Sequence, residues 1–160
     1  MLTHAVQASQ RIMMNLRPAV LDQGLVAAIH WLGNSFAKRT GTETVINAHL
    51  STQRLPKAIE LTAYRTAQEA LTNVGKYAQC TQVKIDLAGD GIFLTLEVTD
   101  NGCGFIESNT GNTGGFGIRG LRERAKTVNG WVDVSSKIGF GTSITLSIPL
   151  TQTTPQENPG

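Results

Sequence analysis

The chain has 160 residues, a net charge of +2, 40% hydrophobic residues and 16% charged residues, which fits one soluble globular domain with a short extension. It contains no basic run and no stretch of about 18 apolar residues, so composition gives no case for direct nucleic-acid binding and predicts no membrane span. Its two cysteines, Cys80 and Cys103, are too few for a disulfide framework and lack the spacing of a zinc site, so we expect a reducing, cytoplasmic environment.

The first predicted element is an amphipathic helix over residues 2–16, in which Leu2, Val6, Met13 and Leu16 recur at roughly helical spacing. The helix stops before Pro18, because the residue that precedes a proline is pushed out of the helical region. A lone helix of this length is marginal in water. We therefore expect it to pack against the rest of the chain or against a second copy.

Two helices and a strand are predicted next. The periodic apolar residues of Leu25 to Arg39 indicate a helix with Gly41 as its C-cap, and residues 44–50 indicate a strand. A long helix is predicted from Pro56, which suits a first turn, to about Ala78.

The second half of the chain reads mainly as strands. Alternating apolar and polar residues predict two strands over 83–87 and 92–98, and the short Gly89-Asp90-Gly91 link makes them a hairpin. The remaining predicted elements are a mobile loop over 101–116, a helix over 118–128, strands over 131–136 and 143–148, and a disordered tail over 151–160. This order predicts an α+β two-layer sandwich, with helices on one face of a mixed, mostly antiparallel sheet.

Polar side chains share one face of the long predicted helix. Glu69, Asn73 and Lys76 are spaced i, i+4 and i+7, which places them in one stripe. An amide oxygen suits Mg²⁺ and an ammonium suits a phosphate. The alternative, on this segment alone, is a solvated helix face.

A carboxylate and two glycines follow the predicted strand 92–98. Asp100 is placed where it can accept a hydrogen bond from an exocyclic amine, and Gly102 and Gly104 would let a ligand ring approach the backbone. Asp-Asn-Gly is also good turn chemistry, so a simple turn is the alternative.

Two further segments are rich in glycine. Residues 114–120 open a helix, where free backbone N–H groups bind anions; a loop rather than a strand precedes them, so this is not the Rossmann fingerprint. Residues 139–142 precede the last predicted strand. Taken singly, residues 114–120 could instead be a flexible linker, and residues 139–142 could be a hairpin turn.

In this order, the four segments resemble the N, G1, G2 and G3 boxes of the GHKL superfamily, which includes histidine kinases, type II topoisomerase ATPase subunits, heat-shock chaperone ATPases and mismatch-repair ATPases. The resemblance covers roughly residues 16–150. Leu16-Arg17-Pro18, with Leu21-Asp22-Gln23-Gly24-Leu25 after it, is similar to the linker of the histidine kinase subfamily that includes nitrate/nitrite sensors. Residues 68–73 and 117–124 are also similar to that subfamily.

The resemblance implies a Bergerat fold that binds ATP and Mg²⁺. It implies that Asp100 accepts from the adenine amino group, with Gly102 and Gly104 at the ring's edge and Thr142 supporting the adenine end. It further implies that Asn73 ligates Mg²⁺.

The resemblance also assigns the phosphate end of the site. Lys76 would reach phosphate, and Glu69 would act as base or polarise the phosphoacceptor. In the lid, Gly115, Gly117 and the neighbouring Ile118 would contact the nucleotide. The family commonly has histidine after the lysine, whereas this chain has Tyr77, which puts any proton relay at this position in doubt.

The implied reaction is transfer of the ATP γ-phosphate to a histidine. His4, His30 and His49 do not fit the acceptor, since His4 lies too close to the linker, His30 sits among core-facing helix positions and His49 is on a strand. We therefore expect a piece of a longer kinase, which cannot phosphorylate itself and which divides into a dimerisation-helix remnant at 1–16, a linker at 17–24 and the ATP-binding catalytic domain at 25–150.

The resemblance implies partners that lie outside the chain. They are the dimerisation domain of a homodimeric parent kinase and a response regulator, typically with a helix-turn-helix output. The parent is expected to be cytoplasmic or a membrane-anchored sensor with this part in the cytoplasm. Two alternatives stay open: a GHKL nucleotide-binding module without phosphotransfer, and an anti-sigma-type serine kinase or ATPase.

Overall fold

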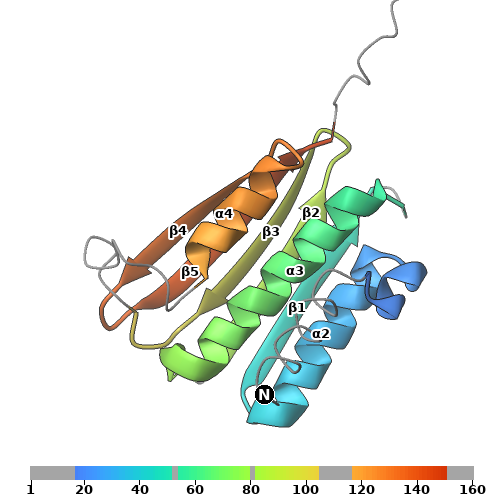
Figure 1. Cartoon of the computed structure of the whole chain (residues 1–160). Helices are drawn as coiled ribbons and strands as arrows, with labels where there is room; N and C mark the ends of the chain where they lie inside the picture. Colours follow the sequence, from blue (N-terminus) through green and yellow to red (C-terminus); the bar gives the residue numbers. More distant parts are fainter. Residues whose placement is uncertain (1–16, 52–53, 80–81, 105–116, 151–160) are drawn as a thin grey trace, which may run out of the picture.

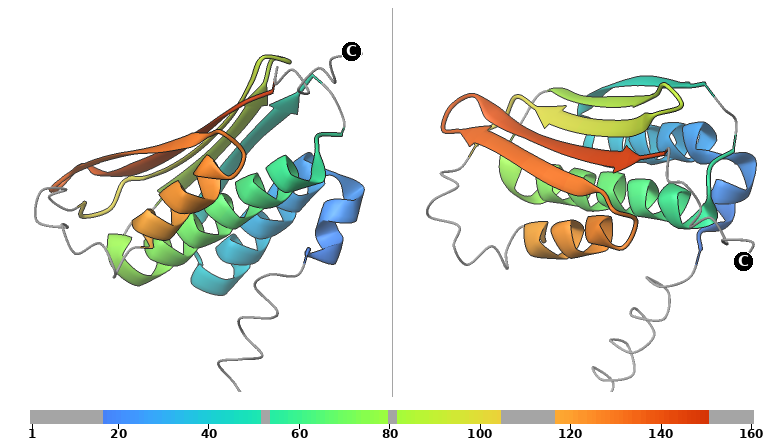
Figure 2. Two further views of the ribbon diagram at one scale, coloured as in Figure 1. Left: turned by 45° about the horizontal axis from the view of Figure 1, so that its top comes forward. Right: turned by 90° about the horizontal axis from the view of Figure 1, so that it is seen from above.

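The computed structural model describes residues 17–51, 54–79, 82–104 and 117–150. The helix predicted over 2–16, most of the glycine-rich loop and the predicted disordered tail lie outside these residues. Within the described part, helices cover one face of a five-stranded sheet, as Figures 1 and 2 show. The predicted α+β two-layer sandwich is thus confirmed.

Residues 17–24, the segment predicted as a linker, form a compact turn before the first described long helix. A 3₁₀ turn, η1 (Ala19–Gln23), buries Leu21 completely and leads into α2 (Leu25–Thr40). Helix α2 ends as predicted at Gly41, whose φ of 70° is left-handed and whose N–H donates to the carbonyl of Ala37.

A parallel crossover links the first two strands. Strand β1 (Glu43–Leu50) pairs in parallel with β2 (Gln82–Gly89), and helix α3 (Lys57–Asn73) makes the connection, as a parallel pair requires. Pro56 precedes α3 in an extended conformation, with ψ of 140°, so it lies just before the helix rather than in its first turn. The predicted helix does continue to Ala78, but its last turn, η2 (Val74–Ala78), is a π-turn.

The other strands are antiparallel. Strand β3 (Phe93–Asp100) forms the predicted hairpin with β2, and β5 (Gly141–Pro149) lies between β3 and β4 (Trp131–Lys137). The sheet order is β1-β2-β3-β5-β4. Helix α4 (Ile118–Lys126) returns the chain across the helical layer before β4.

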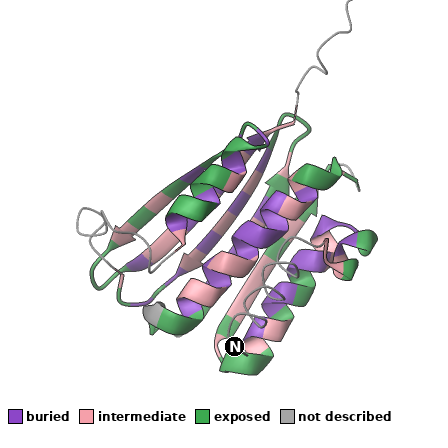
Figure 3. Ribbon diagram, viewed as in Figure 1, coloured by how far each residue is buried: buried purple, intermediate pink, exposed green. Residues whose placement is uncertain are grey.

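The core lies between the helices and the sheet, where Figure 3 shows buried residues along the inner sides of α2 and α3. Two single-residue predictions were wrong. Ile92 lies outside β3, which begins at Phe93, and it is 53% exposed. His30 is exposed rather than core-facing, since the buried residues of α2 around it are Ile29 and Leu32. Among the described residues, no helix combines the length and apolarity needed to cross a bilayer.

Candidate nucleotide-binding site

The predicted site segments meet at one end of the molecule. Figure 1 shows the C-terminal ends of α3 and β3 and the N-terminal ends of α4 and β5 together at the lower left. The β3 and β5 ends are joined directly, because Asp100 pairs with Thr142 across the two strands. The described parts of all four glycine-bearing or polar segments therefore converge, although they are far apart in sequence.

Asp100 is the buried carboxylate of this end, with only 6% of its surface exposed. Its Oδ1 accepts a hydrogen bond of 2.8 Å from the backbone N–H of Gly102, which is itself buried. Burial raises the pKa of Asp100, while the backbone N–H groups of Gly102 and Thr142 act in the opposite direction and lower it. The carboxylate is thus held by amides alone, with no cation to neutralise it among these contacts.

The β4–β5 hairpin closes against the residues after β3. The N–H of Gly139 donates to the carbonyl of Cys103 at 2.7 Å, and Gly104 lies beside the backbone of Lys137. Gly141 has φ of +97°, and a Cβ there would collide with the Asp100 carbonyl. Gly141 was not among the predicted site residues; its place in the Gly-Phe-Gly-Thr segment was the available signal.

Thr142 sits at the start of β5 with its hydroxyl already engaged. Its Oγ1 lies 2.8 Å from the Oγ of Ser136 across the β4–β5 pair. This contact fixes the orientation of the Thr142 side chain next to Asp100. Ser136, on β4, is a second hydroxyl at this end that the sequence did not single out.

Glu69 meets the start of α4. Gly117 precedes that helix with φ of +65°, and a Cβ on it would collide with Glu69 Oε1. The half-buried Glu69 carboxylate is therefore placed at the positive end of the α4 dipole. Ile118, the first residue of α4, has a buried side chain, so any contact it makes with a ligand would come from its backbone.

Asn73 lies on the α-helix α3, whereas Lys76 lies on the π-helical turn that follows it. Asn73 is the last residue of α3 and is half-buried, whereas Lys76 is exposed and belongs to the π-turn. The predicted i, i+7 alignment of Glu69 with Lys76 assumed a regular α-helix, which a π-turn interrupts. Gly115 and the side chain of Tyr77 lie outside the described residues.

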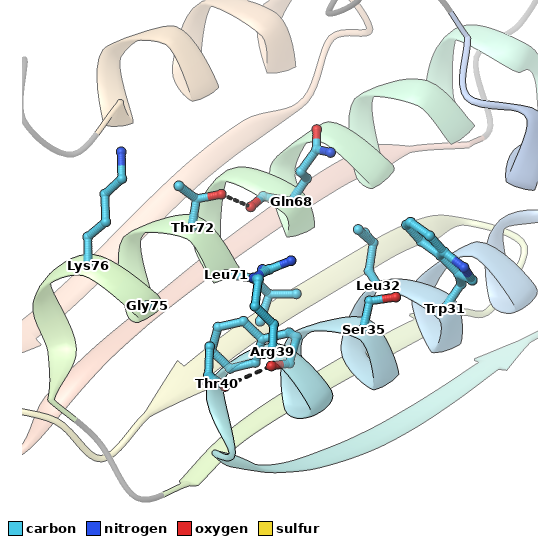
Figure 4. Close-up of a pocket in the computed structure, with 11 residues that line it drawn as sticks. Trp31, Leu32, Ser35, Arg39, Thr40, Gln68, Leu71, Thr72, Gly75 and Lys76 are labelled. Carbon is cyan, nitrogen blue, oxygen red and sulfur yellow. Dashed lines mark hydrogen bonds between the residues drawn. The ribbon is translucent and has the colours of Figure 1, made fainter.

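Lys76 instead forms part of the rim of a groove between α2 and α3. The groove has a volume of about 470 Å³, and Figure 4 shows the labelled Lys76 at its edge with its side chain directed away from Leu71 and Leu32. Its lining also includes the exposed Trp31 and the cationic Arg39. Neither Glu69 nor Asn73 lines this groove, so it is distinct from the convergence around Asp100.

Sequence reasoning missed two buried charged residues on α3. Glu60 is fully buried and its Oε1 accepts from Arg17 at 2.8 Å and from Arg54 at 3.4 Å. Arg65 is 7% exposed and donates to Gln68 Oε1 at 2.7 Å. Burial and the nearby Arg124 lower the pKa of Arg65. A charged residue inside an amphipathic helix gives no periodic signal of its burial, so neither could be found by spacing.

The side chains around the site supply too few metal ligands to hold a cation without a further bound molecule. Across the described segments, no three His, Cys, Asp or Glu side chains gather into a metal-binding group. Asn73 supplies one amide oxygen, and Mg²⁺ typically combines one or two protein ligands with substrate phosphates and water. The single amide oxygen of Asn73 is compatible with a Mg²⁺ ion held mainly by substrate phosphates and water.

Comparison of the sequence with known proteins identifies the family to which the chain belongs. Residues 58–152, more than half of the chain, match the model for histidine kinase-, DNA gyrase B- and HSP90-like ATPases. The chain is 38% identical over 143 residues to the oxygen sensor histidine kinase NreB of Staphylococcus carnosus, covering 89% of this chain and 41% of that protein. The chain thus spans about two fifths of the length of this curated relative.

Solved structures agree on the fold. The histidine kinase domain of a blue-light activated histidine kinase from Erythrobacter litoralis EL346 matches with a TM-score of 0.62 and 22% identity, covering 89% of this chain and 70% of that one. A second structure of that kinase matches with a TM-score of 0.62 and 24% identity, covering 81% of this chain and 43% of the other. At these identities the likeness establishes the fold alone. With the family match over residues 58–152, it follows that the chain belongs to the family of histidine kinase-, DNA gyrase B- and HSP90-like ATPases.

Proposed function

We propose that the chain is the ATP-binding catalytic domain of a sensor histidine kinase, and that it transfers the ATP γ-phosphate to a histidine on a dimerisation domain. The observation that carries the proposal is the convergence of Asp100, Gly117 and Glu69 at one end of the fold. The 38% identity to a sensor histidine kinase supports this branch of the family over the others.

The adenine end of the proposed site is centred on Asp100. Its carboxylate accepts from the adenine amino group, with Gly102 and Gly104 leaving room at the ring's edge. Thr142, oriented by Ser136, supports the same end of the base. A charge-assisted hydrogen bond inside a buried site is the strongest polar contact available for recognition here.

The phosphate end is centred on α3 and the start of α4. Asn73 would hold Mg²⁺, which neutralises phosphate charge when bound, and Lys76 would reach a phosphate by its flexible stem. Glu69 would polarise the phosphoacceptor. The lid residues Gly115 and Gly117, with the backbone of Ile118, would contact phosphates. Phosphoryl transfer relies mainly on such positioning and charge neutralisation.

The partners follow from the same proposal. A homodimeric dimerisation domain supplies the acceptor histidine, and a response regulator with a helix-turn-helix output receives the phosphate. The protein would act in the cytoplasm, free or as the cytoplasmic part of a membrane-anchored sensor. Residues 1–16 would be the end of a dimerisation helix, and residues 17–24 the linker.

Calorimetric titration with Mg-ATP tests the nucleotide site. Asp100→Asn should lower ATP affinity about ten- to a hundredfold, because a hydrogen bond to a charged group contributes roughly 1.5–3 kcal/mol. Asp133→Asn, which removes an exposed carboxylate from β4, is the matched control and should leave affinity unchanged. Equal affinity in the two variants would contradict the proposed adenine contact.

Labelled ATP separates the kinase from its alternatives. The chain alone should gain no acid-labile label from γ-labelled ATP, whereas a supplied histidine-containing dimerisation domain should become labelled. Binding without transfer would favour the inert nucleotide-binding module. Acid-stable label on a serine of a protein substrate would favour the anti-sigma-type kinase, although the Arg17-Pro18 linker supports the histidine kinase.

A further inference from the structure

The helix-facing side of the sheet changes from apolar to polar at a row of residues on three neighbouring strands. Asp100 on β3 pairs with Thr142 on β5, and Thr142 pairs in turn with Ser136 on β4. Side chains two residues apart on a strand share a face, and the next row on this face is apolar, formed by Val98, Ile144 and Val134. Ser136 therefore lies in the same polar row as Asp100 and Thr142.

The row is close enough for direct contacts and is only partly covered. Directly opposed residues on one face of an antiparallel pair have Cβ atoms about 4.5–5.5 Å apart. Asp100 is buried, whereas Thr142 and Ser136 are half-buried. The two hydroxyls thus lie between the buried carboxylate and the edge of the molecule, where a bound base can reach them.

The Ser136 hydroxyl makes two contacts that fix the direction of its proton. It donates to the carbonyl of Gly141 at 3.3 Å, since a carbonyl oxygen can only accept. Its oxygen also lies 2.8 Å from Thr142 Oγ1, the usual distance for a bond between two hydroxyls. Because a hydroxyl carries one proton, Thr142 is then the donor in the second contact.

This order of protons leaves the Thr142 oxygen with lone pairs alone to offer a ligand. The neighbouring Asp100 carboxylate is also an acceptor, and its Oδ1 is held by the N–H of Gly102. Two acceptors therefore lie side by side in the row. A 6-amino purine offers N–H donors from its exocyclic group, whereas a 6-oxo purine places an acceptor oxygen at the same position.

We propose that Ser136 is a positioning residue that holds Thr142 as a hydrogen-bond acceptor and thereby strengthens the preference of the site for a 6-amino over a 6-oxo purine. The inference rests on the proposed ATP-binding function and adds to it a residue outside the predicted site segments. Ser136 acts through Thr142. Without the Ser136 hydroxyl, the Thr142 hydroxyl is free to rotate and to donate its proton to a 6-oxo group.

ATP and ITP are matched probes of this preference, because they share the triphosphate and differ only at the 6-position of the base and the adjacent N1 proton. Calorimetric titration of the full chain with each nucleotide and Mg²⁺ gives the ratio of the two affinities. Ser136→Ala should lower the ATP-to-ITP ratio about three- to tenfold, the effect of one net hydrogen bond. Ser135→Ala removes the exposed hydroxyl next to it on β4 and should leave the ratio unchanged.

Two further variants separate a positioning role from a structural one. Ser136→Thr keeps the hydroxyl and should retain the ratio of the parent chain. In a Thr142→Val chain the positioned hydroxyl is absent, so adding Ser136→Ala should cause no further change in the ratio. If Ser136 were merely structural, Ser136→Ala would weaken both nucleotides equally and leave their ratio unaltered.

Two results would overturn the inference while ATP binding holds. One is the same ATP-to-ITP ratio in the Ser136→Ala and Ser135→Ala chains, and the other is a Ser136→Ala effect of full size in the Thr142→Val background. Failure of the proposed function looks different. The parent chain would then bind neither nucleotide, or Asp100→Asn would bind ATP as tightly as the parent, and the inference would fall with it.

Discussion

Glu60 and Asp100 are both buried carboxylates, and they differ in what surrounds them. Glu60 is completely buried and shares its Oε1 between two guanidinium groups, those of Arg17 and Arg54. Asp100 is 6% exposed and is held by backbone N–H groups, with burial raising its pKa. Glu60 is neutralised by two cations of the protein, whereas the contacts of Asp100 within the described residues include no cation.

The difference supports a structural role for Glu60 and the proposed recognition role for Asp100. Glu60 joins Arg17 to α3, and its Oε1 is paired with two guanidinium groups before any ligand arrives. Asp100 carries a desolvation cost in the folded protein, and a ligand that donates a hydrogen bond to it would offset that cost. A strained electrostatic state of this kind is typical of binding sites rather than of scaffolds.

The largest expected effect comes from removing a cation from Glu60. Arg17→Met should lower the free energy of unfolding by about 3 kcal/mol, since a buried carboxylate then loses its shorter ion pair. Urea unfolding measures the loss. The matched control is Arg119→Met, which breaks an exposed i, i+4 pair with Glu123 and should change stability by less than about 1 kcal/mol. Similar losses in both variants would show that Glu60 does not depend on Arg17.

A smaller loss is expected where a third carboxylate, Glu69, meets Gly117. Gly117→Ala should destabilise the fold by about 1–2 kcal/mol, the cost of a left-handed conformation for a residue with a Cβ, and should displace Glu69. Gly120→Ala, at a helix position with open space around it, should instead stabilise by about 0.4–1 kcal/mol. Thermal unfolding of both variants tests whether the contact, rather than the loss of glycine, matters.

The charge of Asp100 should also appear in the pH dependence of stability. Because its pKa is raised in the folded state, the folded protein holds this proton more tightly than the unfolded chain, and stability falls as pH rises from the ordinary aspartate pKa through the folded value. The Asp100→Asn variant has no carboxyl group at this position, so its stability does not fall in this way as pH rises. The melting temperature of the variant relative to the parent should therefore increase over that pH range, and a constant difference would contradict the burial argument.

The smallest effect is expected at Asp90, an exposed carboxylate in the β2–β3 turn. Backbone N–H groups of Phe93 and Ile92 donate to its Oδ1, both at 2.8 Å, and lower its pKa. Its contribution is present above the ordinary aspartate pKa and is lost as pH falls through the lowered value. Asp90→Ala should thus reduce the melting temperature slightly at neutral pH and not at strongly acidic pH.

The sequence predicted the elements that depend on periodicity and turn chemistry. Gly41 as a C-cap, the β2–β3 hairpin and the layer of helices on one sheet face were all predictable from local patterns. The parallel pairing of β1 with β2 was not, because it depends on contacts between residues 39 positions apart, such as Glu43 and Gln82. The π-turn around Lys76 has no sequence pattern that distinguishes it from regular helix.

The candidate site was predictable as a set of segments and less so as a geometry. Asp100, Gly117 and Glu69 were identified from motif order, and the structure brings their segments together. Glu60, Arg65 and Gly141 were missed. Their positions are fixed by tertiary burial and by close backbone approach, which spacing along a helix or strand does not encode.

The parallel pairing of β1 with β2 has a consequence for how the chain folds during synthesis. Strand β1 lies at the sheet edge and pairs only with β2 in the described order, so residues 43–50 have no partner until the ribosome has released residues 82–89. Non-local pairing of this kind slows folding. Until then α2 has no completed sheet to cover, and a nascent chain that ends before residue 82 should be a preferred target for chaperones that bind exposed apolar helices.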